Sequence, residues 1–229
     1  MYNHSMGKLY LVSTPIGNLE DLSIRAINTL KNVDLILAED TRRSSILLKH
    51  YSVNKLLSSF HEHNEEKKQN EIIEKLKQGQ NIALISDAGT PTLSDPGYKL
   101  IRECVKENIK VISIPGASAV ITALASSGLP TDSFSFFGYA PKKGGKKRLF
   151  YEKMHKSLDG ITSTVILFES PYRLEKTLQE LASIFPEKNL VIARELTKAH
   201  EEIIRGKVAF VAKILKGKKL KGEITILIN

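Results

Sequence analysis

Three segments of the chain combine glycine, proline and short polar residues in a way that suits ligand binding. Residues 13–21 read STPIGNLED, residues 86–97 read SDAGTPTLSDPG, and residues 113–120 read SIPGASAV. Glycine lets a ligand approach the backbone closely, and proline restricts the motion of a loop. A loop that is already rigid loses little entropy when it binds a polar ligand. We therefore predict a small-molecule site, with residues 86–97 as its main wall.

Plainer interpretations of these segments remain open. Residues 13–21 could be an ordinary turn before a helix, and residues 86–97 an elaborate structural turn. The glycine fingerprints of dinucleotide-binding and P-loop proteins are absent from the sequence. Glu39 and Asp40 follow an apolar run and could bind a ribose, but Asp40 could equally begin a helix as its N-cap.

Other residue types with chemical potential favour structural roles. Cys104 is the one cysteine of the chain, so an internal disulfide is excluded. Its context, LIRECVKEN, predicts a buried helical thiol. His61 and His63 lack the spaced partners of a metal site and indicate a polar loop, so no metal is expected.

The three loops lie between short apolar runs and amphipathic segments, which alternate along the whole chain. This alternation is typical of α/β architecture. Five strands are expected in the first half, joined by crossovers long enough to place them in a mainly parallel sheet, and a mixed sheet with helices in the second. The expected strands are 8–13, 33–40, 56–60, 81–86, 110–114, 133–138, 163–168, 189–194 and 222–229. We place the domain boundary near residue 116, giving α/β domains at 1–116 and 117–229.

Positive charge is concentrated in the second half. Residues 1–116 carry 15 Lys and Arg against 14 Asp and Glu, whereas residues 117–229 carry 19 against 11. Two basic clusters, within 142–148 and 213–221, indicate a polyanionic partner such as nucleic acid. A solvated basic surface is the alternative, although Gly144 and Gly145 favour a flexible basic loop. No run approaches the roughly 18 apolar residues of a membrane span, and the first residues lack a signal peptide, so we expect a cytoplasmic protein without a membrane partner.

Six motifs, in this order, resemble a known family. They are TPIGNLEDLS, AEDTR, SDAGTPTLSDPG, PGASA, FESPYRL and ARELTKAHEE. The chain is similar, from about residue 8 to its end, to the ribosomal RNA small subunit methyltransferase I family of the tetrapyrrole methylase superfamily. The resemblance implies a two-domain α/β fold of tetrapyrrole methylase type, a homodimer, and S-adenosylmethionine held in a cleft between the domains. It also implies methylation of a cytidine ribose 2′-hydroxyl in small-subunit (16S) ribosomal RNA, within the assembled 30S subunit.

The resemblance also assigns roles residue by residue. The implied cofactor-binding residues are Pro15, Asp87, Ala88, Gly89, Thr90, Pro91, Leu93, Ser94, Asp95, Ala117, Ser118, Phe168, Glu169, Ser170 and Pro171. The cleft-facing candidates for catalysis are Glu169, Arg173, Arg194, Glu195 and Lys198, with Thr197 beside them. A carboxylate among them could act as general base and a cation could stabilise the developing oxyanion, or all could form interdomain salt bridges. The expected RNA-binding residues are Lys142, Lys143, Lys146, Lys147 and Arg148.

Two other functions are compatible with parts of this pattern. A tetrapyrrole (precorrin-type) methylase would share the cofactor loops but would not need a basic second half. A noncatalytic RNA-binding module would share the basic clusters but would have no use for the loop at 86–97.

Overall fold

Strands of four or five residues, most of them rich in apolar side chains, form a parallel sheet in the first half of the chain. The computed structural model describes residues 6–142, 144–160 and 163–229, and the chain divides into two compact units, 1–118 and 119–229. The strands of the first unit are β1 (Lys8–Val12), β2 (Leu35–Ala38), β3 (Leu56–Ser59), β4 (Ile82–Ile85) and β5 (Lys110–Ile114). They are all parallel in the order β3-β2-β4-β1-β5, which confirms the predicted parallel sheet.

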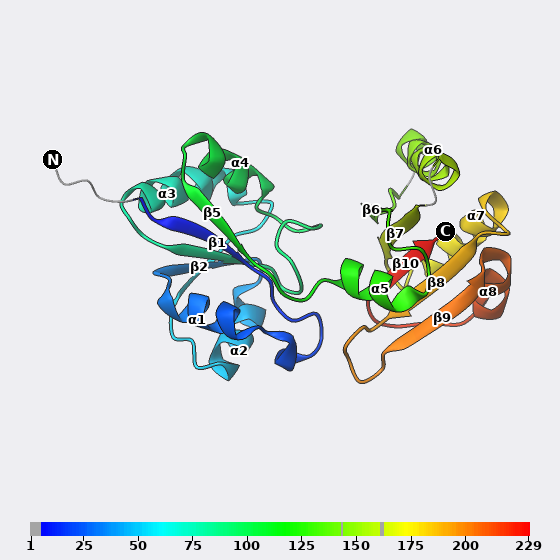
Figure 1. Cartoon of the computed structure of the whole chain (residues 1–229), viewed down its shortest axis with the longest axis horizontal. Helices are drawn as coiled ribbons and strands as arrows, with labels where there is room; N and C mark the ends of the chain where they lie inside the picture. The colour runs from blue at the N-terminus through cyan, green and yellow to red at the C-terminus, as the bar shows by residue number, and fades with distance from the viewer. Residues whose placement is uncertain (1–5, 143, 161–162) are drawn as a thin grey trace. The chain divides into compact units, whose positions relative to one another are not determined.

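Helices cover both faces of this first sheet. The helical elements are η1 (Leu19–Asp21), α1 (Ile24–Asn32), α2 (Thr41–His50), α3 (Glu65–Lys77) and α4 (Tyr98–Lys106). One core cluster joins the sheet to α1 and α2, and a second joins it to α3 and α4 (Figure 1). Every residue of β2 and β4 is buried because both faces of these strands are covered.

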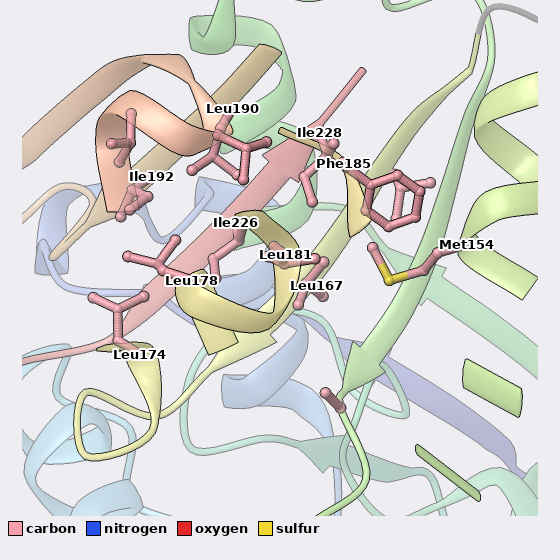
Figure 2. Packing of buried hydrophobic residues seen from close by; sticks show 14 of the residues in the cluster. Met154, Leu167, Leu174, Leu178, Leu181, Phe185, Leu190, Ile192, Ile226 and Ile228 are labelled. Carbon is pink, nitrogen blue, oxygen red and sulfur yellow. The ribbon is translucent and has the colours of Figure 1, made fainter. Parts of the chain in front are cut away.

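The second unit is built on a mixed sheet, as predicted. Its elements are α5 (Ala119–Ser127), β6 (Phe134–Tyr139), α6 (Gly144–Gly160), β7 (Thr164–Glu169), α7 (Leu174–Ile184), β8 (Asn189–Arg194), β9 (Glu202–Lys207), α8 (Val208–Leu215) and β10 (Ile224–Ile228). The order is β6-β7-β10-β8-β9, with β6 parallel to β7 and the other pairs antiparallel. Figure 2 shows Leu174, Leu178 and Leu181 of α7 packed over Leu167 and Ile226 of the sheet.

Two features of the second unit differ from the sequence-based expectation. Strand β9 was not predicted, because EIIRGK lacks a clear apolar alternation and forms an edge strand on β8. The segment expected as a flexible basic loop begins a helix instead, since α6 starts at Gly144. In the described part of the chain, no helix is long and apolar enough to span a membrane.

Candidate functional site

The loops that follow β1 and β4 are tied together by their backbones. These strands are neighbours in the parallel sheet, so the loops leave the same edge. Thr14 N donates to Gly89 O at 2.9 Å, and Gly89 N donates to Thr14 O at 3.0 Å. Two hydroxyls reinforce this bridge, because Thr14 Oγ1 donates to Ser86 O at 3.1 Å and Ser86 Oγ donates to Gly89 O at 2.9 Å. The start of the 86–97 loop is therefore fixed on the 13–21 loop.

The loop after β5 joins the same group. Thr90 Oγ1 lies 3.3 Å from both Ser13 Oγ and the Ala117 carbonyl oxygen. A Cβ on Gly116 would lie 2.9 Å from Ser13 Cβ, so only glycine lets the two loops approach this closely. The structure thus brings the three predicted loops together in the first unit, with Pro15, Ala117 and Ser118 beside the 86–97 loop.

The 86–97 loop has an unusual backbone. Gly89 (φ 87°), Thr92 (φ 74°), Ser94 (φ 71°) and Gly97 (φ 121°) all have positive φ. Threonine and serine rarely adopt this conformation, and such strain is concentrated at functional sites. Pro91 is buried, while Ala88 and Leu93 are exposed at the surface of the loop. The loop is therefore more than a connection between β4 and α4.

Three carboxyl groups lie close to one another at this edge of the sheet. Burial raises the pKa of Asp95 to about 7, and repulsion from Glu39 and Asp87 adds to this rise. Burial, with repulsion from Asp87, likewise raises the pKa of Glu39. Asp87 accepts a hydrogen bond from Asp40 N at 3.0 Å and lies 3.5 Å from Arg43 Nη1. This concentration of negative charge suits a cationic ligand.

Asp40 takes the structural role left open for it. Its carboxylate accepts hydrogen bonds from the backbone and side chain of Arg42 and caps the N-terminus of α2. The hydrogen bonds from Arg42 lower the pKa of Asp40 to about 2. Cys104 is fully buried in α4, as its sequence context predicted. Burial raises the pKa of its thiol to about 11. The described residues contain no group of three or more His, Cys, Asp and Glu that could hold a metal ion.

Glu169, at the end of β7, is held by several donors. Its oxygens accept hydrogen bonds from Ser170 N at 2.7 Å and Thr177 Oγ1 at 2.6 Å. Arg173 Nε lies 3.4 Å from Glu169 and the same guanidinium donates to Ala140 O at 2.6 Å. Because both carboxylate oxygens are engaged in a buried place, these contacts favour a positioning role over a general base. Phe168 packs edge-on against Phe136, while Ser170 and Pro171 begin the next loop.

A second ion-paired group follows β8. Lys198 Nζ lies 2.7 Å from Glu195 and 3.0 Å from Glu223, and Arg194 Nε lies 3.0 Å from Glu202. Hydrogen bonds from Lys198 and from the Glu223 backbone lower the pKa of Glu195, which weakens it as a base. All of these ion pairs join residues of the second unit to one another, so they are not the interdomain salt bridges considered as an alternative.

The loop that carries this ion-paired group is strained. Glu195 (φ 51°) and Thr197 (φ 65°) have positive φ, and Thr197 Oγ1 is buried without a hydrogen-bond partner among the described residues. Thr197 was expected beside the catalytic candidates, but periodicity and composition gave no sign of this backbone conformation.

Two of the expected RNA-binding residues already form ion pairs within the protein. Lys147 Nζ lies 2.5 Å from Glu180, and Arg148 Nε lies 3.3 Å from Glu152. Lys142 and Lys146 are exposed, and Lys143 lies outside the described residues. The structure therefore places part of this cluster in ion pairs on the surface of α6.

A family model described as "Tetrapyrrole (Corrin/Porphyrin) Methylases" matches residues 8–212. The solved structure of a cobalt precorrin-4 methyltransferase superposes with a TM-score of 0.69 at 17% identity, covering 97% of this chain and 94% of that one. Diphthine synthase gives a TM-score of 0.73 at 15% identity, covering 97% and 90%. At such identities these structures show the fold alone. The chain belongs to the tetrapyrrole methylase family.

Comparison with individual protein sequences places the chain more closely within the tetrapyrrole methylase family. A protein of Thermotoga maritima is 47% identical over 224 residues, which cover 98% of this chain and 99% of the relative. A protein of Hydrogenobaculum sp. is 50% identical over 224 residues, covering 97% and 95%. Both relatives are named ribosomal RNA small subunit methyltransferase I, and the chain groups with them within the family.

Proposed function

We propose that this chain transfers the methyl group of S-adenosylmethionine to the 2′-hydroxyl of a cytidine ribose in 16S ribosomal RNA. The observation that carries this proposal is identity of 47% and 50%, over nearly the whole chain, to two ribosomal RNA small subunit methyltransferases I. We further propose that the chain acts as a homodimer in the cytoplasm, on RNA within the assembled 30S subunit. The basic second half agrees with a polyanionic substrate.

The first unit has a site that fits this cofactor. Three loops are held together by hydrogen bonds around Gly89. Because Gly89 has no side chain, a ligand can approach the backbone closely at this point. The carboxyl groups of Glu39, Asp87 and Asp95 suit a ligand with a sulfonium and an ammonium group. The proposed wall in the first unit is Pro15, Asp87, Ala88, Gly89, Thr90, Pro91, Leu93, Ser94, Asp95, Ala117 and Ser118.

The second unit is proposed to supply the rest of the site. Phe168, Glu169, Ser170 and Pro171 at the end of β7 are proposed to contact the cofactor as well. When bound, the cofactor supplies an electrophilic methyl group that already carries its activation. The protein must then align the ribose oxygen with the methyl carbon and exclude water, which can reduce the barrier by several kcal/mol.

The ion pairs of the second unit suggest how its residues contribute. The transfer would form a bond between the ribose oxygen and the methyl carbon and break the carbon–sulfur bond, with its electron pair going to sulfur. The hydroxyl proton would pass to solvent. Arg194 is the last residue of β8 and Lys198 lies in the loop that follows, and their positive charge would stabilise the developing oxyanion. Glu195 would position Lys198, and Glu169 would position Arg173 and the 170–171 loop.

Transfer of label from cofactor to RNA tests the proposal. The protein is incubated with S-adenosylmethionine labelled in the methyl group and with small ribosomal subunits that lack the modification, and the label is then mapped. We expect label on the ribose of a single cytidine of 16S RNA. Label in a tetrapyrrole but not in RNA would favour the precorrin-type methylase, and failure to bind the cofactor would favour the noncatalytic module.

A further inference from the structure

A pocket in the second unit lies between the start of α7 and the segment that joins α8 to β10. Its volume is about 530 Å³, which is within the range of roughly 300–1,000 Å³ typical of ligand pockets. Leu174, Leu178 and Leu215 form a buried apolar floor. None of the roles inferred from the family resemblance refers to this pocket, although Pro171 lines it too.

The rim of the pocket is aromatic and basic. Tyr172 is 97% exposed, an unusual state for a large aromatic residue. Lys218, Lys219 and Lys221 line the pocket and are exposed as well. An apolar floor, with one aromatic ring and three ammonium groups at the rim, suits a ligand that has both a planar ring and negative charge.

The basic segment is held in place by hydrogen bonds. Gly217 N donates to Glu175 Oε1 at 3.2 Å. Glu175 is the acidic residue that lines the pocket, so this hydrogen bond occupies one of its carboxylate oxygens. Arg194 Nη1 donates to Lys221 O at 3.1 Å. Gly222 (φ 95°) packs so closely on Glu195 that a Cβ would collide with it. The lysines therefore start from a fixed backbone, which reduces the cost of ordering them around a ligand.

We propose that this pocket receives one unpaired nucleotide of the substrate RNA near the methylated cytidine. The base would stack on Tyr172 over the leucine floor, and Lys218, Lys219 and Lys221 would neutralise adjacent phosphates. The inference rests on the proposed function, and it places the nucleotide near the target because Pro171 belongs both to this pocket and to the proposed cofactor wall.

Two variants test the pocket: Tyr172→Ala, and the triple variant Lys218→Ala, Lys219→Ala and Lys221→Ala. We expect each to raise KM for small ribosomal subunits about tenfold with little change in kcat, because an interaction away from the reacting atoms strengthens ground state and transition state equally. The triple variant should also bind protein-free 16S RNA more weakly, with a salt slope smaller by about one for each phosphate that the lysines no longer neutralise. Tyr172→Phe should retain the wild-type KM, since phenylalanine keeps the stacking surface.

Controls separate this pocket from general charge and from the proposed function. The variant Lys31→Ala, Lys67→Ala and Lys110→Ala removes three exposed lysines of the first unit and should keep the wild-type KM. Calorimetry should show unchanged cofactor affinity in all variants. Wild-type protein that labels no RNA would overturn the proposed function itself.

Other outcomes would overturn the pocket alone. If the wild type labels the RNA and both pocket variants keep its KM, the pocket has no role in substrate binding. If KM rises on subunits while binding of protein-free RNA is unaltered, the pocket contacts a ribosomal protein and the RNA proposal fails.

Discussion

Asp95 is a residue whose charge depends on its surroundings in the folded loop. Its carboxyl group is partly buried beside Glu39 and Asp87, and burial with this repulsion raises its pKa to about 7 from an ordinary 3.8. The folded state therefore binds a proton that the unfolded chain releases between about pH 4 and pH 7. Because the folded state is the one that holds the proton, the free energy of unfolding falls as pH rises through this window.

Asp95→Asn should remove this pH dependence. Asparagine cannot ionise, so at pH 8 the variant should be more stable than the wild type by on the order of 1 kcal/mol. This difference is smaller than the pKa shift alone would give, because the carboxyl group of Asp95 is partly hydrated. At pH 4 the difference should disappear. Urea unfolding at both pH values measures this, with the exposed Asp132→Asn as control. Equal pH profiles for wild type and Asp95→Asn would contradict the prediction.

Gly89 is the residue on which the proposed cofactor loop depends most directly. Its φ of 87° disfavours any side chain, and a Cβ there would lie 3.3 Å from Ile16 Cγ2. We predict that Gly89→Arg lowers cofactor affinity at least tenfold, because the side chain would occupy the space where backbone and ligand are proposed to meet.

Calorimetry of a variant with wild-type circular dichroism measures this decrease. Gly128→Arg is a matched control, since Gly128 also has positive φ (78°) but a Cβ there meets nothing within 4 Å. The control carries similar backbone strain and should bind the cofactor normally. Unchanged affinity in folded Gly89→Arg would refute the prediction.

At the scale of elements, hydrophobic pattern predicted the strands that are buried on both faces. β2 and β4 are wholly apolar and buried, so both were located, and their parallel order places the loops of the candidate site at one edge. β9 was missed because an edge strand needs little apolar surface. The start of α6 was missed because two glycines favoured a loop, whereas the helix begins at the first of them.

The side-chain contacts of the candidate site could not be predicted in this way. Motifs identified Glu169, Arg173 and Glu195 as site residues, but some of their hydrogen-bond partners are distant in sequence. These partners include the Ala140 carbonyl group and the backbone N–H of Glu223. The positive φ of Thr197 has no local sequence signal either. Periodicity therefore predicts where a loop lies, and only the folded structure shows which of its charges are paired.

Thr177 connects α7 to the end of β7. Its hydroxyl donates to Glu169 Oε2 at 2.6 Å in a buried setting. Thr177→Val should lower the free energy of unfolding by about 1–3 kcal/mol, because it leaves a buried carboxylate oxygen without its donor. Urea denaturation measures the change, and Thr177→Ser, which keeps the hydroxyl, should recover most of the stability. An unchanged free energy of unfolding in Thr177→Val, which replaces only the hydroxyl with a methyl group, would contradict the prediction.

At the scale of the whole molecule, charge is divided unequally along the chain. The first 116 residues are nearly neutral, whereas the rest carry an excess of eight positive charges. Acidic side chains gather at the loops proposed for a cationic cofactor, and exposed lysines occur where RNA is proposed to bind. Cofactor binding and RNA binding should therefore respond differently to salt.

Replacing Lys142, Lys143, Lys146, Lys147 and Arg148 with Ala should separate the two kinds of binding. RNA affinity should fall and its dependence on salt should flatten, because fewer counterions are released, while cofactor affinity stays unchanged. The slope of RNA affinity against salt concentration should change by less than the loss of five unpaired charges would cause. The reason is that Lys147 and Arg148 already pair with Glu180 and Glu152. Filter binding over a series of salt concentrations measures the slope, and calorimetry measures the cofactor. An unaltered slope would show that this cluster is a solvated surface, leaving the lysines of 218–221 as the remaining basic contact for RNA.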